Sequence, residues 1–195
     1  MDEWAVKVGP LESLSIFRCP DAHKDQLFAS SALLSQFNTM DEYGTPYTTD
    51  VDDLKYMRLA IDEANKSPPA DKAYCVGACL IDRDGALLST GYSRELPGNT
   101  HAEQCALMKL QQSELAHGGT MYTTMEPCSI RLSGNRPCVE SIVEAKVSRV
   151  VMGVREPPNL VNCEGVQLLQ KHGIDVFIVP GVQEDCLAPN KHILQ

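Results

Sequence analysis

The chain has 195 residues, of which 43% are hydrophobic, and its formal net charge is −9 at pH 7. This length and apolar content are sufficient for one ordinary core and argue against general disorder. The acidic balance argues against a nucleic-acid partner, because polyanion binding needs a basic surface. No apolar run approaches the ~20 residues of a membrane span, and the N-terminus lacks the basic and apolar segments of a signal peptide. We therefore expect a cytoplasmic protein with no membrane contact.

The cysteine content bears on metal binding. Eight cysteines are present, at positions 19, 75, 79, 105, 128, 138, 163 and 186. In a reducing compartment a disulfide framework is not expected, and clustered cysteines bind metal or stay reduced in the core. Cys75, Cys79 and Cys105 lie in apolar patterns, so we interpret all three as small core residues.

Residues 1–50 show weak periodicity and carry no recognisable chemistry. A helix over 24–37 would have an irregular apolar face. Turn-forming and polar residues over 38–49 predict a linker. The sequence thus predicts an accessory N-terminal extension over 1–50, either packed on the domain or partly mobile, and a single domain over 51–195.

Helices and strands are expected in regular order after residue 50. A helix over 51–66 has apolar residues at spacings of three and four. Strands over 75–82 and 87–92 are joined by a hairpin turn at Asp84-Gly85. The later elements are a helix over 101–115, a strand over 121–125, a helix over 137–146, a strand over 149–154, a helix over 164–172, a strand over 174–179 and a short helix over 184–194. This order predicts a three-layer α/β/α sandwich around a mixed five-stranded sheet.

The residues that carry chemistry lie between Asn99 and Cys138. His101 is followed two positions later by Glu103, and the cysteines Cys128 and Cys138 come further along the chain. One imidazole and two thiolates can bind tetrahedral zinc and leave the fourth position for water. A carboxylate that is not a ligand can then move protons between that water and a substrate. We predict a Zn²⁺ site formed by His101, Cys128 and Cys138, with Glu103 as the catalytic acid and base.

The cysteines make this prediction more specific than the His-x-Glu pair alone. A surface histidine beside a glutamate favoured by a helix dipole is the alternative interpretation of that pair. Cys138 follows Pro137, which suits a helix start, and a helix N-terminus stabilises a thiolate. The order matches the zinc-deaminase signature, in which His-x-Glu precedes Pro-Cys-x-x-Cys. Here nine residues separate the cysteines instead of two.

The widened loop between the cysteines is a candidate substrate-binding segment, because predicted metal ligands hold both of its ends. Arg131 and Arg136 can pair with a phosphate, although two solvent-facing arginines are the alternative. Asn135 in the same loop is a further candidate. Asn99 can hydrogen-bond a sugar-like chain, and the alternative is an asparagine that structures the loop after Gly98.

Three runs resemble the cytidine-deaminase superfamily, namely His101-Ala102-Glu103, Thr124-Met125-Glu126-Pro127-Cys128-Ser129 and Arg136-Pro137-Cys138. Within it, the cysteine spacing is similar to that of the riboflavin-pathway pyrimidine deaminases. The run Gly-Tyr-Ser-Arg-Glu-Leu-Pro-Gly-Asn-Thr-His-Ala-Glu-Gln over 91–104 resembles the fungal form. The likeness covers roughly residues 52–195.

The resemblance implies zinc-dependent hydrolytic deamination of 2,5-diamino-6-ribitylamino-4(3H)-pyrimidinone 5′-phosphate in riboflavin biosynthesis. The expected partner is therefore a small phosphorylated pyrimidine, and similar deaminases lead us to expect a homodimer. Bacterial members have Asn-Pro where this chain has Ala73-Tyr74, and Asp-Pro-Asn-Pro where it has Glu156-Pro157-Pro158-Asn159. Bacterial substrate contacts are therefore not transferred to this chain.

Two other functions remain open. The first is a nucleoside, nucleotide or tRNA deaminase of the same fold, although the acidic charge argues against RNA. The second is a non-catalytic, zinc-stabilised partner subunit. A structural zinc site is usually closed by four protein ligands, so Glu103 argues against it unless Cys105 or Cys163 supplies the fourth.

Overall fold

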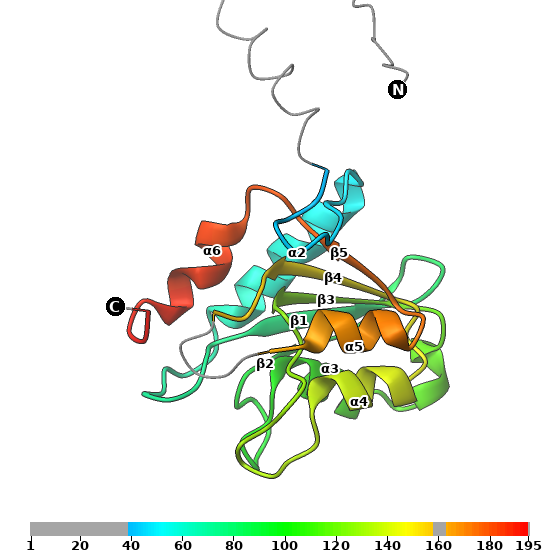
Figure 1. Ribbon diagram of the computed structural model, residues 1–195. Coiled ribbons are helices and arrows are strands. Elements are labelled where there is room, and N and C mark those ends of the chain that lie inside the picture. The colour runs from blue at the N-terminus through cyan, green and yellow to red at the C-terminus, as the bar shows by residue number, and fades with distance from the viewer. Residues whose placement is uncertain (1–38, 158–162, 195) are drawn as a thin grey trace, which may run out of the picture. The chain divides into compact units, whose positions relative to one another are not determined.

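The computed structural model describes residues 39–157 and 163–194, and Thr39–Gln195 form one compact unit (Figure 1). The helix expected over 24–37 lies outside the described residues, so a separate N-terminal extension stays a prediction. None of the helices in the described part has the length and apolar character needed to cross a membrane.

The described domain is built on a five-stranded sheet in the order β2-β1-β3-β4-β5. The strands are β1 (Gly77–Ile81), β2 (Leu87–Tyr92), β3 (Thr120–Met125), β4 (Arg149–Val154) and β5 (Asp175–Ile178). Strand β1 pairs antiparallel with β2 and β3, whereas β3, β4 and β5 are parallel. The mixed sheet expected from the sequence is confirmed.

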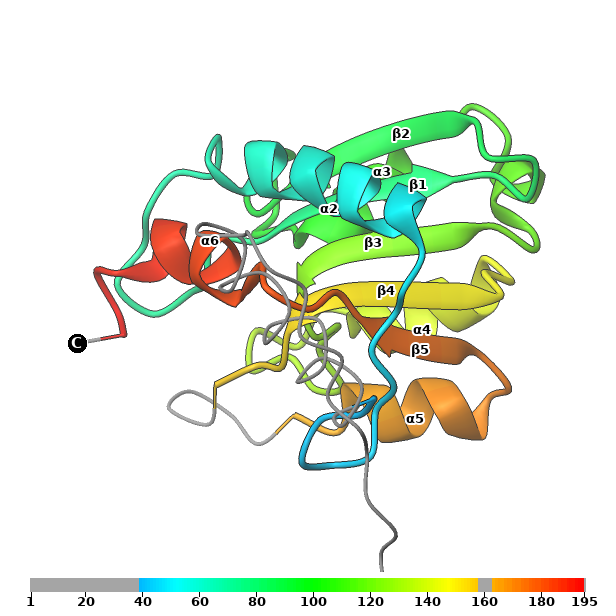
Figure 2. The ribbon, with the colours of Figure 1, turned by 90° about the horizontal axis from the view of Figure 1, so that it is seen from above.

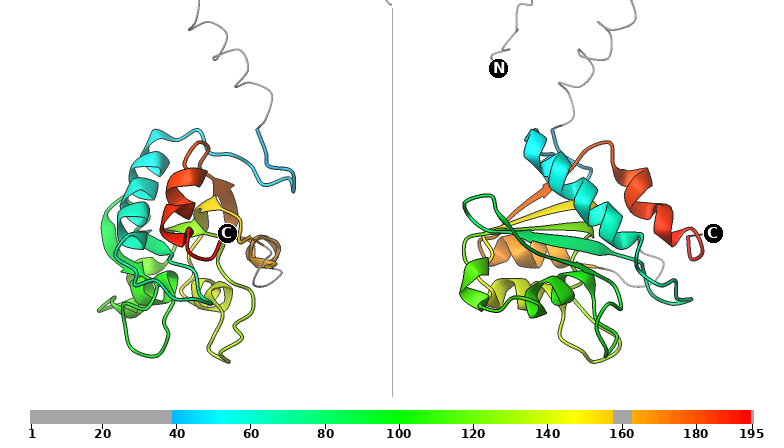
Figure 3. Two further views of the ribbon diagram at one scale, coloured as in Figure 1. Left: turned by 90° about the vertical axis from the view of Figure 1, so that its left-hand side faces the viewer. Right: turned by 180° about the vertical axis from the view of Figure 1, so that it is seen from behind.

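Helices cover both faces of this sheet (Figures 1, 2 and 3). The helices are α2 (Val51–Ala64), α3 (Ala102–Met108), α4 (Cys138–Glu144), α5 (Gly165–Lys171) and α6 (Gln183–Leu187), with 3₁₀ turns at Ser113–Ala116 and Ala188–Asn190. Helices α2 and α6 pack on one face around Met57 and Cys186, and α3, α4 and α5 pack on the other around Ile142 and Leu169. The expected three-layer sandwich is therefore confirmed.

Two strand glycines let the helices approach the sheet closely. A Cβ atom on Gly77 would lie 2.0 Å from the Ala60 carbonyl oxygen of α2. A Cβ atom on Gly91 would lie 2.2 Å from the Ala102 carbonyl oxygen, at the first turn of α3. Any larger residue at position 91 would therefore displace the helix start that carries the predicted site residues.

The helix expected over 101–115 is shorter than predicted. Helix α3 ends at Met108, and a 3₁₀ turn over Ser113–Ala116 follows. Ala116 is completely buried, whereas Met108 is 60% exposed. The chain turns away from the helix axis because this brings Ala116 into the core before β3 begins.

The linker interpretation of residues 38–49 was wrong for residues 39–49. Thr45 and Thr48 are buried, and the backbone N–H of Thr48 donates to the Ile178 carbonyl oxygen at 2.9 Å. The Thr48 hydroxyl also donates to Asp53, a buried residue of α2. The compact unit thus begins at Thr39 rather than at Val51, because polar side chains of this segment find partners on the sheet and on α2.

Candidate metal centre and active-site pocket

The predicted zinc ligands meet at the carboxyl end of β3. Cys128 lies just beyond that strand, His101 is the extended N-cap residue of α3, and Cys138 is the first residue of α4. Their ligand atoms all lie within 4.8 Å of one another. Nδ1 of His101 is 3.4 Å from each Sγ. Tetrahedral zinc needs an N···S separation of about 3.6 Å, so the three residues fit Zn²⁺ without rearrangement.

Hydrogen bonds prepare the two cysteines for metal. The backbone N–H of Cys138, at the start of α4, donates to Cys128 Sγ at 3.3 Å. A hydrogen bond from the Cys138 thiol lowers the pKa of Cys128 to about 4. The same bond, together with complete burial, raises the pKa of Cys138. Thiolate ligation requires that a proton held by this pair leave when the metal binds.

Glu103 lies beside the ligand group and is 3% exposed. Its Oε2 is 3.4 Å from Cys138 Sγ, and its Oε1 is 3.2 Å from the Thr123 hydroxyl. Burial raises the pKa of Glu103, and the nearby Cys128 thiolate adds to this effect. A carboxyl group that readily takes up and releases a proton suits general acid and base catalysis.

Neither cysteine considered as a fourth ligand joins the metal group. The Cys105 thiol donates to the Thr100 hydroxyl at 3.1 Å. The half-buried Cys163 thiol lies 3.5 Å from the Pro127 carbonyl oxygen. Within the described residues the metal group consists of His101, Cys128 and Cys138. A fourth coordination position thus remains for water, as in catalytic zinc sites.

The metal group opens into a cavity of about 170 Å³. Its wall contains three cationic residues, two further carboxylic acids and one buried tyrosine, namely Lys72, Arg94, Arg131, Glu126, Glu156 and Tyr74. Burial raises the pKa of Glu156 to about 7. The cavity therefore combines a metal group with polar side chains from loops that are distant in sequence.

The residues predicted to bind substrate divide into two pairs. Asn99 and Arg131 line the cavity, whereas Asn135 and Arg136 do not. The Arg131 side chain donates to the Asn99 carbonyl oxygen and, at 2.9 Å, to Gln104.

The second pair is engaged outside the cavity. The Asn135 amide donates to the Gly98 carbonyl oxygen at 3.0 Å. Arg136 pairs with Glu140 at 3.4 Å and with Glu144 on the exposed side of α4. A substrate contact by Asn135 or Arg136 stays a prediction.

Several of the residues that line the cavity were not identified from the sequence. Lys72 lies in a loop outside any motif, so nothing in the sequence indicated it. Arg94 belongs to the run over 91–104 that resembles the fungal deaminases, but its residue type alone did not indicate a place in the cavity. Glu126 stands in the run before Cys128, and Glu156 follows β4 at a position where the chain departs from the bacterial pattern. Acidic residues directly after parallel strands were the available signal, because the carboxyl ends of such strands meet at one edge.

The three-ligand group, the non-ligating Glu103 and the mixed sheet have the arrangement of a catalytic zinc site on the deaminase fold. Residues 50–154 match the family model described as the cytidine and deoxycytidylate deaminase zinc-binding region. The chain therefore belongs to this family, and its cofactor is Zn²⁺.

Particular relatives narrow the comparison. The chain is 42% identical over 184 residues to the diaminohydroxyphosphoribosylamino-pyrimidine deaminase of Schizosaccharomyces pombe, covering 93% of this chain and 44% of that protein. It resembles the Aspergillus oryzae Rib2 deaminase solved in complex with DARIPP, with a TM-score of 0.63 and 36% identity over 70% of this chain and 88% of that one. Acinetobacter baumannii RibD gives a TM-score of 0.62 and 32% identity over 71% of this chain and 38% of that one. The chain spans less than half the length of the first curated relatives it matches.

Proposed function

We propose that the chain catalyses zinc-dependent hydrolytic deamination of 2,5-diamino-6-ribitylamino-4(3H)-pyrimidinone 5′-phosphate in riboflavin biosynthesis. The observation that carries the reaction type is the buried Glu103 carboxyl group beside the His101, Cys128 and Cys138 cluster. The similarity to the Schizosaccharomyces pombe deaminase and to the Rib2 complex with DARIPP supports the substrate class.

The proposed chemistry assigns two proton transfers to Glu103. Bound Zn²⁺ supplies Lewis acidity that lowers the pKa of a water molecule toward ~7. Glu103 accepts a proton from the attacking water and delivers it to a pyrimidine ring nitrogen. As the oxygen bonds to the amino-bearing carbon, Glu103 then passes the second water proton to the departing amine. The C–N bond breaks, and the products are the ring carbonyl compound and ammonia.

The charges around the cavity support a phosphorylated substrate. Six arginine and lysine residues form ion pairs within the described part of the chain, and none of the three cavity cations is among them. Arg131 is only 8% exposed and its Nε is buried without a hydrogen-bond partner in the described structure. Uncompensated buried cations are costly. An anionic group on the substrate supplies the missing counter-charge.

Lys72 is the cavity cation best placed to contact the phosphate directly. The Arg94 guanidinium donates to the Pro68 and Tyr74 carbonyl oxygens, and that of Arg131 is bound to the Asn99 carbonyl oxygen. Lys72 is exposed and forms no hydrogen bond or ion pair with the residues that the structure describes. Its ammonium group is therefore available, whereas the two arginines contribute fixed positive charge.

The assay that tests the function measures ammonia release by the purified, zinc-loaded chain. Its substrates are the phosphorylated pyrimidinone, the same compound without phosphate, cytidine and deoxycytidylate. We expect the phosphorylated pyrimidinone to be the only one of these four compounds that is turned over at a useful rate. Turnover of cytidine or deoxycytidylate without turnover of the pyrimidinone would contradict the proposal.

The variant Lys72→Met tests the phosphate contact separately. Loss of one charge-assisted bond raises KM for the phosphorylated substrate about tenfold and leaves KM for the dephosphorylated compound unchanged. Lys171→Met is the matched control, because Lys171 is an exposed lysine at the end of α5. Equal KM changes for both substrates would remove Lys72 from the phosphate site.

We also infer a homodimer in the cytoplasm. Size-exclusion chromatography with light scattering measures the oligomeric state of the purified protein. Imaging of the tagged chain in cells measures its location.

A further inference from the structure

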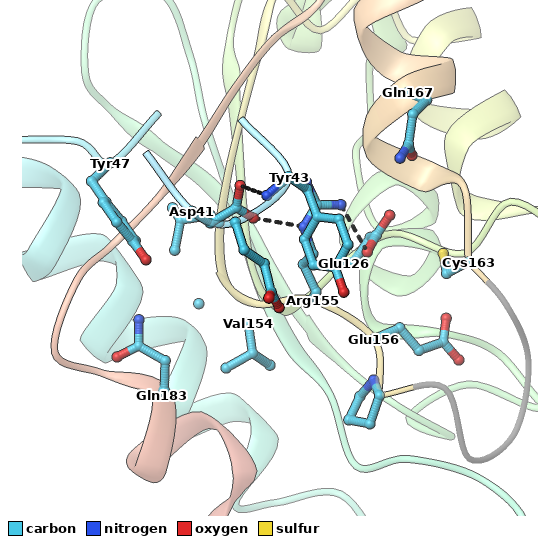
Figure 4. Close-up of a pocket in the computed structure, with 14 residues that line it drawn as sticks. Asp41, Tyr43, Tyr47, Glu126, Val154, Arg155, Glu156, Cys163, Gln167 and Gln183 are labelled. Carbon is cyan, nitrogen blue, oxygen red and sulfur yellow. Dashed lines mark hydrogen bonds and ion pairs between the residues drawn. The ribbon is translucent and has the colours of Figure 1, made fainter. Parts of the chain in front are cut away.

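Arg155 lies directly after β4 at the centre of a cluster of polar side chains (Figure 4). Its Nε donates to Asp41 Oδ2 at 2.7 Å, and its Nη2 donates to the Thr45 hydroxyl. The guanidinium group lies 4.7 Å from the centre of the Tyr43 ring. The turn over 41–45 therefore holds this arginine from three sides, by an ion pair, a hydrogen bond and a cation–π contact.

The fourth neighbour of Arg155 is Glu126, which precedes Pro127-Cys128. Arg155 Nη1 lies 3.7 Å from Glu126 Oε2, and the Glu126 side chain is 2% exposed. The other carboxylate oxygen accepts a hydrogen bond from the backbone N–H of Val166 at 3.0 Å. Figure 4 shows the Glu126 side chain pointing toward Arg155. Glu126, two positions before the predicted ligand Cys128, is thus held by Arg155 at one carboxylate oxygen and by the Val166 N–H at the other.

Close packing transmits this arrangement to Cys128. A Cβ atom on Gly165 would lie 2.0 Å from the Pro127 carbonyl oxygen and 3.1 Å from Glu126 Cγ, so α5 contacts this segment directly. On its other side, Cys128 accepts through its carbonyl oxygen from Val139 N–H at 3.3 Å. The segment carrying Cys128 has little freedom to move unless Glu126 moves.

The charge balance makes Arg155 essential to this arrangement. Glu126 and Asp41 are both largely buried, and Arg155 is the cation that pairs with each of them among the described residues. Without the guanidinium group, two carboxylates would remain close together without compensation. A buried carboxylate that loses its partner either moves toward water or destabilises its surroundings.

We propose that Arg155, held by the Asp41–Thr45 turn, is a positioning residue that fixes Glu126 and thereby Cys128 for zinc binding. Arg155 and the turn over 41–45 lie outside residues 50–154, the region that matches the family model, whereas Glu126 and Cys128 lie inside it. The segment over 41–45 thus supports zinc binding by holding Arg155. This inference rests on the proposed zinc ligands.

The opposite end of β4 provides a matched control. Arg149, the first residue of β4, pairs with buried Asp53 at 2.6 Å and lies 4.7 Å from the Phe177 ring centre. It shares with Arg155 the strand, the kind of ion pair and the aromatic contact. Its partner, Asp53, lies on α2 and bonds within the described residues to Thr48, Tyr122 and Arg149, none of which belongs to the metal group.

The experiment measures zinc affinity by chelator competition in Arg155→Gln and Arg149→Gln, with circular dichroism to verify folding. Loss of an outer-shell partner weakens zinc binding by about 10–100-fold, which we expect for Arg155→Gln alone. Arg149→Gln lowers thermal stability and leaves the zinc Kd unchanged. Equal zinc affinity of Arg155→Gln and the wild type, or equal weakening in both variants, would overturn the inference.

Charge compensation provides a second test. In Arg155→Gln/Glu126→Gln the uncompensated Glu126 carboxylate beside the Cys128 segment is gone, although that of Asp41 remains, so zinc affinity recovers by about tenfold relative to Arg155→Gln. No recovery would contradict the charge argument. Asp41→Asn replaces Arg155→Gln if that variant fails to fold, and it is expected to weaken zinc binding in the same direction. A wild-type chain that binds no zinc would instead contradict the proposed function.

Discussion

Replacing Glu103 by glutamine tests the proposed chemistry directly. The change keeps the shape of the side chain and removes its ability to accept and release a proton. The amide nitrogen can donate to the Cys138 sulfur, which lies 3.4 Å from Glu103 Oε2 in the wild type. The fold and the metal group should therefore remain intact, and the zinc Kd should stay within about threefold of the wild-type value.

The expected loss of activity follows from the two proton transfers. General acid and base catalysis by one side chain contributes about 10²–10⁴-fold, and Glu103 is assigned both transfers, so kcat should fall about 10⁴-fold. At 1.36 kcal/mol per factor of ten, this equals about 5.5 kcal/mol of transition-state stabilisation. The Thr123 hydroxyl, which lies 3.2 Å from Glu103 Oε1 and 3.0 Å from the Met125 carbonyl oxygen, only orients the carboxyl group. Thr123→Val should therefore lower kcat about tenfold.

The assay combines single-turnover ammonia release with zinc quantification on the same preparation. Glu114→Gln is the control, because Glu114 is an exposed glutamate on the 3₁₀ turn after α3. A zinc-loaded Glu103→Gln protein with kcat within tenfold of wild type would refute the assignment. A variant that loses both zinc and activity would show that Glu103 acts through the metal group instead.

Three further predictions concern stability. Asp53→Asn should lower the free energy of unfolding near pH 7 by about 3 kcal/mol, because it breaks a buried ion pair. Burial alone would raise the pKa of Asp53, but hydrogen bonds from Arg149, Thr48 and Tyr122 outweigh it and lower that pKa. The contribution is present above the unfolded pKa and is lost as pH falls through the folded one, so denaturant titrations of both proteins should converge below pH ~4. Gly165→Ala should lower the free energy of unfolding by about 1–3 kcal/mol, seen as a lower melting temperature, because the alanine Cβ would overlap the Pro127 carbonyl oxygen. A zinc chelator should lower the wild-type melting temperature, and added zinc should raise it with concentration, since metal binds the folded state.

The sequence predicted the sheet and the zinc group because both depend on local patterns. Alternating helix and strand patterns determine the layer arrangement. His101 and Cys138 were expected at helix starts, and they are the N-cap of α3 and the first residue of α4. A helix start restricts where a side chain can reach, so residue type and spacing were informative about the metal group.

The remaining contacts of the site depend on long-range pairing that no local pattern contains. Asp41 and Arg155 are separated by 114 positions in the chain, and each looks like an ordinary surface residue in sequence. Residues 39–49 were interpreted as a linker because turn-formers and polar side chains are also typical of linkers. What distinguishes them is the burial of their polar groups against partners on the sheet.

The acidic net charge and an anionic substrate are compatible because the relevant charges are local. At physiological ionic strength, exposed charges more than about 8 Å away are strongly screened. Lys72, Arg94 and Arg131 line one small cavity, whereas a carboxylate there, Glu126, is already paired with Arg155. The phosphate of the proposed substrate would therefore meet positive charge at short range although the whole chain carries −9. Net charge argues against a long polyanion, which must contact an extended surface, but it does not exclude a single phosphate.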